Sequence, residues 1–171
     1  MTTTRTTTRR PTGTTTAYTA RPITPAVLRS LRATDDAGRP LRPFTDEEGG
    51  APLRCCLRRS EPGERIALVS YAPLRRWAAE TGADPGAYDE QGPVFIHAEE
   101  CPGPAPDPAL PFTNAHRVLR RYSADGRILG GRLTADDFPS ALTEAFTDPE
   151  VALVHVRAVE YGCFLYEVRR G

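Results

Sequence analysis

Cysteine and histidine are the residue types in this chain best able to carry out chemistry, and most of them fall in three short segments. Those segments hold six of the chain's seven cysteines and histidines: Cys55, Cys56, His97, Cys101, His155 and Cys163. A thiolate is a nucleophile, an imidazole is an acid or a base near neutral pH, and both bind metals. If the three segments are neighbouring strands, these side chains converge on one site.

The segment Leu-Arg-Cys-Cys-Leu-Arg at 53–58 is expected to be a β-strand, in which alternate residues face opposite sides. Its apolar face would carry Cys55, which is expected to pack in the core. Its polar face would place Cys56 between Arg54 and Arg58, whose positive charges favour a thiolate. Cys56 is therefore the candidate nucleophile, and the alternative is an ordinary half-exposed cysteine.

Two histidines are the candidate acid-base groups. His97 and Glu99 would share one face of a strand over 93–99, which brings an imidazole near a carboxylate. His155 lies in another strand-like segment, on a face that is apolar at its start and polar at its end. Structural roles remain open for both histidines, because a buried histidine bonded to a backbone carbonyl gives the same pattern.

Arginines and tyrosines in or beside these segments are candidates for binding a ligand. The predicted binding residues are Arg54, Arg58, Arg157, Tyr71 and Tyr161. Guanidinium groups bind carboxylates and phosphates through paired hydrogen bonds, and surface salt bridges to Asp and Glu are the alternative. The catalytic interpretation needs no cofactor. A zinc site is the other possibility, with the ligands Cys56, His97, Cys101 and Cys163.

Composition excludes several classes of function. The 171-residue chain has no lysine, which excludes Schiff-base chemistry and the phosphate-binding lysine of Walker-type loops. Residues 1–34 carry six arginines and no acid, so the remainder is acidic and its folded part is not expected to bind nucleic acid. No apolar run approaches the roughly 18 residues that span a membrane, and no secretory signal is present. We expect a cytoplasmic protein whose cysteines are reduced.

The periodicity of apolar residues predicts an α+β fold. Residues 1–20, rich in Thr and Arg, are expected to be a disordered tail, followed by a single domain over 21–171. Helices are expected at 25–33, between Pro73 and Gly82, and at 138–147. Strands are expected at 53–58, 65–71, 93–99, 117–122, 127–133, 151–157 and 163–169. They would form an antiparallel or mixed sheet of about seven strands, with two or three helices against it. The segments 35–51 and 102–111 are expected to be loops.

Three stretches resemble a known bacterial family, the domain of unknown function 1203. They are PLRCCLRRSEPGERIALVSY at 52–71, GPVFIHAEEC at 92–101 and DPEVALVHVRAVEYGCFLYEVRR at 148–170. The most specific pieces are 61–64, 155–157 and 162–164. The family has no assigned activity, so the resemblance supports the fold and leaves the function to be argued from the residues.

The leading hypothesis is a small enzyme or ligand-binding domain for an anionic small metabolite. Arginines would hold the anion, and Cys56, His97 and His155 would carry out acyl or amide chemistry. A second hypothesis is a non-catalytic interaction or regulatory domain, in which the basic N-terminal arm and the hairpin at 117–133 contact a partner. The third is a zinc-binding domain.

Overall fold

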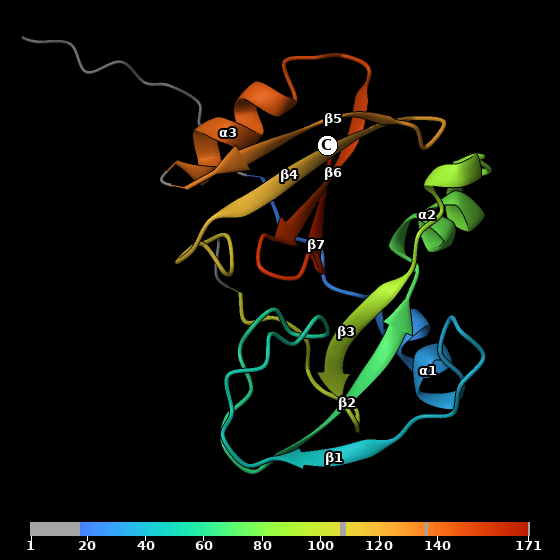
Figure 1. The fold of residues 1–171 in the computed structure, drawn as a ribbon, viewed down its shortest axis with the longest axis vertical. Coiled ribbons are helices and arrows are strands. Elements are labelled where there is room, and N and C mark those ends of the chain that lie inside the picture. The colour runs from blue at the N-terminus through green and yellow to red at the C-terminus, as the bar shows by residue number, and fades with distance from the viewer. Residues whose placement is uncertain (1–17, 107–108, 136, 171) are drawn as a thin grey trace, which may run out of the picture.

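The computed structural model describes residues 18–106, 109–135 and 137–170. Within them, seven strands, three α-helices and one short 3-10 helix (Gly86–Tyr88) form an α+β fold (Figure 1), which confirms the predicted class. The strands make two antiparallel sheets. Nearly all of the predicted tail lies outside the described residues. None of the helices in the described part has the length and apolarity needed to cross a bilayer.

The smaller sheet has three strands in the order β1-β2-β3, and helix α1 packs against it. These elements are α1 (Pro25–Ala33), β1 (Pro43–Asp46), β2 (Glu64–Tyr71) and β3 (Gly92–His97). Thr24 caps α1, and its hydroxyl accepts a hydrogen bond from the amide of Val27. The buried stripe of α1, Leu28 and Leu31, joins β2 and β3 in one apolar core.

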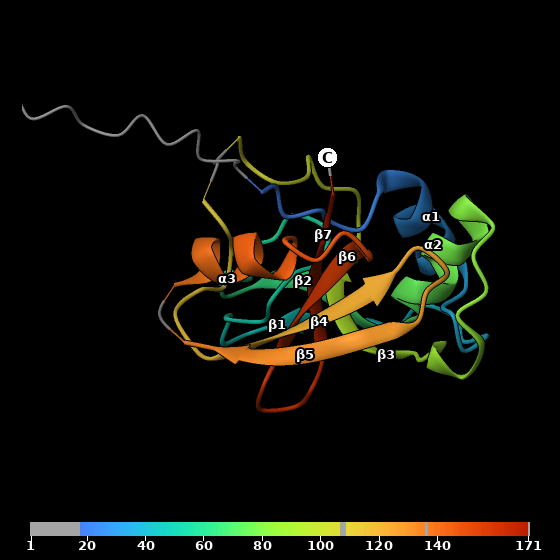
Figure 2. The same cartoon turned by 90° about the horizontal axis from the view of Figure 1, so that it is seen from above.

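The larger sheet has four strands in the order β5-β4-β6-β7. Its elements are β4 (Arg117–Ser123), β5 (Ile128–Thr134), β6 (Val151–Ala158) and β7 (Phe164–Arg169). Helix α3 (Phe138–Ala145) packs against one face (Figure 2), on Val154 and Val156. Helix α2 (Pro73–Thr81) packs against the other face through Trp77. The predicted hairpin at 117–133, formed by β4 and β5, is confirmed, and β6 and β7 form a second antiparallel pair.

Two predictions about the smaller sheet were wrong. Residues 53–58 are not a strand: Leu57 has a φ of 58°, and its amide bonds the carbonyl of Leu53, so the chain turns. No hairpin joins this segment to β2, which pairs with β1 and β3 instead. β1 lies inside the segment 35–51 that was expected to be a loop. Its exposed positions left no apolar alternation for the sequence to reveal.

Candidate metal centre

The chain segment that carries Cys55 and Cys56 is a closed turn, here called the cysteine turn (residues 51–60). Its ends are joined where the amide of Ser60 donates to the carbonyl of Ala51, at 2.9 Å. The amide of Arg54 donates to the carbonyl of Phe95 in β3, also at 2.9 Å. That bond pins the turn beside the end of β3. Because adjacent residues in such a turn do not alternate as they do in a strand, Cys55 and Cys56 both face the same neighbour, His97.

The segment that carries His97 and Cys101 is held by helix α1. The guanidinium of Arg32 donates to the carbonyl of His97 at 3.3 Å and to the carbonyl of Glu99 at 2.6 Å. β3 ends at His97, and these bonds fix the course of the chain just beyond the strand. The chain then returns Cys101 to the same neighbourhood as His97.

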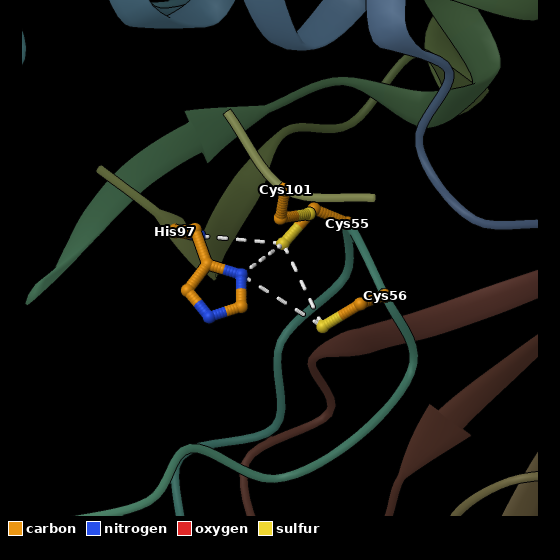
Figure 3. A group of neighbouring side chains, drawn as sticks. All are labelled: Cys55, Cys56, His97 and Cys101. Carbon is orange, nitrogen blue, oxygen red and sulfur yellow. Dashed lines mark hydrogen bonds between the residues drawn. The ribbon is translucent and has the colours of Figure 1, made fainter. Parts of the chain in front are cut away.

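Four side chains meet in the Cys/His cluster, which consists of Cys55, Cys56, His97 and Cys101 (Figure 3). One ligand atom from each lies within 4.8 Å of all the others. The Nδ1 atom of His97 is 3.3 Å from the sulfur of Cys55 and 3.8 Å from that of Cys56, and the two sulfurs are 4.0 Å apart. Cys55 and Cys56 are buried, whereas His97 and Cys101 are partly exposed.

The two adjacent thiols differ in acidity. The Cys55 thiol donates a hydrogen bond to the sulfur of Cys56, and this bond lowers the pKa of Cys56. The backbone amide of Arg58 and the charges of His97 and Arg58 act in the same direction, against the effect of burial. The same bond between the thiols, together with burial, raises the pKa of Cys55. Cys56 is therefore the first of the pair to become a thiolate.

An ion pair between Arg58 and Glu64 lies on the side of the His97 imidazole that faces away from the thiols. Its Nε2 atom is 3.4 Å from a carboxylate oxygen of Glu64 and 3.3 Å from the guanidinium of Arg58. Arg58 donates to both oxygens of Glu64, at 2.9 and 2.6 Å. The hydrogen bond from Arg58 and that from the amide of Glu61 lower the pKa of Glu64 to about 2. Glu64 is thus an ionised acceptor for the outer nitrogen of His97.

The distances in the Cys/His cluster suit a tetrahedral zinc ion. Zinc bonds of about 2.3 Å to sulfur and about 2.0 Å to nitrogen give sulfur–sulfur separations of about 3.8 Å and sulfur–nitrogen separations of about 3.5 Å. The measured values of 3.3 to 4.0 Å bracket these separations. Three cysteines and one histidine are also a common donor set of structural zinc sites. The cluster could therefore hold a metal such as zinc.

The ligand set differs from the predicted one in one member. The ligands expected from the sequence are Cys56, His97, Cys101 and Cys163, with Cys55 packed in the core. In the structure, Cys55 is buried in the apolar core as expected, but it also belongs to the cluster, whereas Cys163 does not. Cys163 lies next to the turn between β6 and β7, where its thiol is 3.7 Å from the carbonyl of Tyr161. The exchange follows from the cysteine turn, since a regular strand would have directed Cys55 away from Cys56.

His155 does not join the other predicted catalytic residues. It is fully buried in β6, with its ring between Tyr122 and Phe164 at centroid distances of 4.7 and 5.0 Å. Its Nε2 atom is 3.4 Å from a carboxylate oxygen of Glu167 on β7. Burial lowers the pKa of His155. The three segments therefore do not converge as expected, because β6 belongs to the other sheet.

Glu99 and the predicted binding residues are also dispersed. The carboxylate beside His97 is Glu64, and Glu99 pairs instead with Arg65 at 3.2 Å. Arg157 contacts Glu90, and Arg58 contacts Glu64, so these two cations do not share an anion site. Tyr71 is buried against Phe164, and Tyr161 is largely exposed. Arg54 is buried and donates to the carbonyl of Phe164 at 2.8 Å.

Comparison with known proteins places the chain in a family. Residues 50–170 match the family described as Protein of unknown function (DUF1203). The chain belongs to this family. No curated protein and no solved structure matches the chain. The DUF1203 match covers the whole cysteine turn, all four members of the Cys/His cluster, and the supporting pair Arg58 and Glu64. It excludes α1, which supplies Arg32, and β1.

Proposed function

We propose that this DUF1203 protein is a zinc-binding domain with a closed, structural Cys3His centre. The observation that carries the proposal is the approach of four ligand atoms, from Cys55, Cys56, His97 and Cys101, to within 4.8 Å of one another. Thiolate and imidazole ligands favour zinc over magnesium or calcium, which prefer oxygen. Four protein ligands leave no open position for a water molecule or a substrate. Zinc would therefore stabilise the fold and would not carry out catalysis.

The contacts around His97 support a metal on its Nδ1 atom. A ligating histidine usually donates its other ring N–H to a carboxylate or a carbonyl, which fixes the tautomer. Glu64 is that carboxylate, 3.4 Å from Nε2, and Arg58 keeps it in place. The backbone amide of His97 also donates to the sulfur of Cys55 at 3.3 Å. This bond would offset part of the negative charge that three thiolates bring to the site.

The position of the cluster explains what a metal would contribute. It would cross-link the cysteine turn to the end of β3 and to the chain at Cys101, just before the proline-rich stretch. In the described parts of that stretch, 102–106 and 109–111, no helix or strand stabilises the chain. Because the unfolded chain holds no such preformed site, most of the free energy of metal binding becomes free energy of folding.

Elemental analysis of protein purified without chelators tests the proposal. Wild-type protein should carry one equivalent of zinc, and the variant Cys101→Ser should carry much less. The matched control is Cys163→Ser, which removes a cysteine outside the cluster and should leave the zinc content unchanged. Equal zinc contents in the two variants, or no metal in the wild type, would refute the proposal.

One observation favours a second candidate, a thiolate enzyme. Cys56 lines a cavity of about 650 Å3 that the proline-rich stretch and Leu57 also border. An acidic thiol beside a cavity is the arrangement of a cysteine nucleophile, with His97 as the adjacent base. This candidate predicts that the metal-free protein hydrolyses activated acyl esters and that Cys56→Ser abolishes the turnover. Under the zinc proposal, wild-type protein and Cys56→Ser should both be inactive towards such esters.

A further inference from the structure

A groove of about 500 Å3 lies between the two sheets. It is called the arginine groove here because Arg54, Arg59 and Arg117 line it. One wall comes from β2 and β3, through Leu68 and Phe95, and the facing wall comes from the turn between β6 and β7. The segments that form it lie next to one another in Figure 1. None of the four members of the Cys/His cluster lines the groove. The groove is therefore a separate site from the cluster, although Arg54 and Arg59 belong to the same cysteine turn.

Arg54 is the unusual residue of the groove. Only 2% of its surface is exposed, and its guanidinium donates to two neutral carbonyls, those of Phe164 at 2.8 Å and of Pro52. Within the described residues it makes no ion pair with a carboxylate. Buried charges are normally paired, because leaving water without a counter-ion is costly. Burial lowers the pKa of Arg54 to about 10; the charge of Cys163 opposes this shift, and the charge of Arg59 adds to it.

Arg59 adds a second cation that also lacks a carboxylate partner in the described part of the chain. It donates to the carbonyl of Gly50 at 2.7 Å, and its guanidinium lies 5.9 Å from the centre of the Phe112 ring. A third arginine of the groove, Arg117, differs because it is near Glu160, at 3.8 Å. The groove therefore holds two guanidinium groups whose mutual repulsion an anion would relieve.

Phe112 is held in a conformation that few residues adopt. Its φ is 57°, in the left-handed region that disfavours bulky side chains. The guanidinium of Arg117 binds its carbonyl at 2.8 Å, and its ring faces the groove under Arg59. Backbone strain of this kind persists where the surroundings enforce it, and it is frequent at binding sites. Here the enforced conformation presents an aromatic surface beside the two cations.

We propose that the arginine groove binds a small monocarboxylate with an apolar body. The carboxylate would pair with Arg54 and Arg59, and the apolar body would lie against Phe95, Phe112 and Leu165. The guanidinium groups supply charge-assisted hydrogen bonds, and the apolar walls supply the area that an organic acid would bury. The groove thus supports the anionic small-molecule ligand expected from the sequence, with Arg59 in place of Arg58 and Arg157.

Isothermal titration of the full-length protein tests this assignment with a panel of probes: acetate, hexanoate, phenylacetate, phenyl phosphate and benzyl alcohol. Hexanoate or phenylacetate should bind at least about tenfold more tightly than benzyl alcohol, which lacks the charge, and than acetate, which lacks the body. Binding should weaken as the salt concentration rises. The assignment is overturned if neither hexanoate nor phenylacetate binds, whether or not phenyl phosphate does. It is also overturned if benzyl alcohol binds as tightly as these two acids.

Two variants locate the ligand in the groove. Arg59→Gln should weaken binding of the preferred acid at least about tenfold, whereas Arg29→Gln, which removes an exposed arginine of α1, should not. Phe112→Gly removes the ring and relieves the left-handed strain, but it also loses the packing of the ring on the core of the larger sheet, so its affinity for the preferred acid should fall and its Tm is measured alongside. Unchanged affinity in both Arg59→Gln and Phe112→Gly would overturn the assignment, whatever the wild-type protein binds.

Discussion

The environments of His97 and His155 contain the same residue types, but they give the two histidines different roles. His97 and His155 each lie near a glutamate, at 3.4 Å in both cases. The other nitrogen of His97 faces two thiols, whereas Nδ1 of His155 is buried and has no hydrogen-bond partner among the described residues. An imidazole near a carboxylate is therefore not enough to mark a reactive site. The groups facing the second nitrogen decide what the histidine is able to do.

The difference has a structural origin. His155 sits in the middle of a regular strand, between the rings of Tyr122 and Phe164, where apolar packing surrounds it. His97 is the last residue of its strand, where the irregular cysteine turn comes close enough to bring sulfur atoms to it. Regular elements build the core, and the irregular segment builds the candidate metal centre.

The largest expected effect is the loss of stability when the proposed metal is removed. Structural zinc contributes about 10 kcal/mol or more of apparent binding free energy in small domains, so chelation should lower the Tm by about 10 °C or more. Differential scanning calorimetry with and without a strong chelator measures the shift. His155→Phe should show the same shift as the wild type, because His155 lies outside the cluster. A Tm that is insensitive to the chelator in metal-loaded wild-type protein would contradict the proposal.

The next largest expected effect is a loss of zinc affinity when the carboxylate of Glu64, which lies near Nε2 of His97, is replaced. Glu64→Gln keeps the shape of the side chain but weakens the hydrogen bond that would orient the ligating imidazole. Changes at such supporting residues typically reduce metal affinity by about 10- to 100-fold. Competition with a zinc indicator measures the affinity. Glu99→Gln is the control, since Glu99 pairs with Arg65 and should leave the affinity unchanged. If Glu64→Gln and the wild type bind zinc with equal affinity, Glu64 does not help to orient His97 for metal binding.

The smallest effect is the pH dependence of stability that arises from the His155–Glu167 pair. Burial lowers the pKa of His155, so below about pH 6.5 the unfolded chain takes up a proton that the folded protein does not. Burial would raise the pKa of Glu167, but its hydrogen bonds with His155 and Arg169 and the charge of Arg169 outweigh this and lower it. Its contribution is thus present above the unfolded pKa of about 4.3 and is lost as the pH falls. Both groups make acid destabilising.

His155→Phe separates this contribution from the rest of the protein. Between pH 7 and pH 5 the unfolding free energy of the variant should fall less than that of the wild type, by at most about 1.4 kcal/mol per pH unit, so its Tm should also fall less. The measurement is the Tm against pH, on wild-type protein and variant at equal metal loading. His116→Gln replaces an exposed histidine and serves as the control. Parallel pH profiles for wild type and His155→Phe would show that His155 does not titrate on unfolding.

Much of the fold could be predicted because its elements have regular periodicity. β2, β4, β6 and β7 alternate or are strongly apolar, and Gly126 takes the positive φ that the predicted hairpin turn requires. The prediction of a strand at 53–58 was wrong because an alternating pattern of Leu, Cys and Leu also suits a turn whose apolar side chains point inward. Nothing in the sequence marks Leu57 as left-handed, since that conformation usually calls for glycine.

Part of the candidate site could also be predicted from the sequence. Cys56, His97 and Cys101 were grouped as metal ligands because they are soft donors in strand-like segments. Cys55 was missed through the strand assignment, and Glu64 was missed because its contact with His97 crosses 33 positions of the chain. His155 was expected to lie beside Cys56 and His97, and it lies elsewhere for a different reason. Strand order is set by packing between segments distant in sequence, and parity along one strand does not reveal it.

X-ray absorption spectroscopy at the zinc edge tests the central claim most directly, on wild-type protein purified without chelators. The proposed Cys3His centre predicts three sulfur neighbours at about 2.3 Å and one nitrogen neighbour at about 2.0 Å. The His97→Ala variant should lose the nitrogen neighbour or the metal itself. A first shell of nitrogen and oxygen alone, or purified protein without bound metal, would contradict the account and leave Cys56 as a candidate nucleophile.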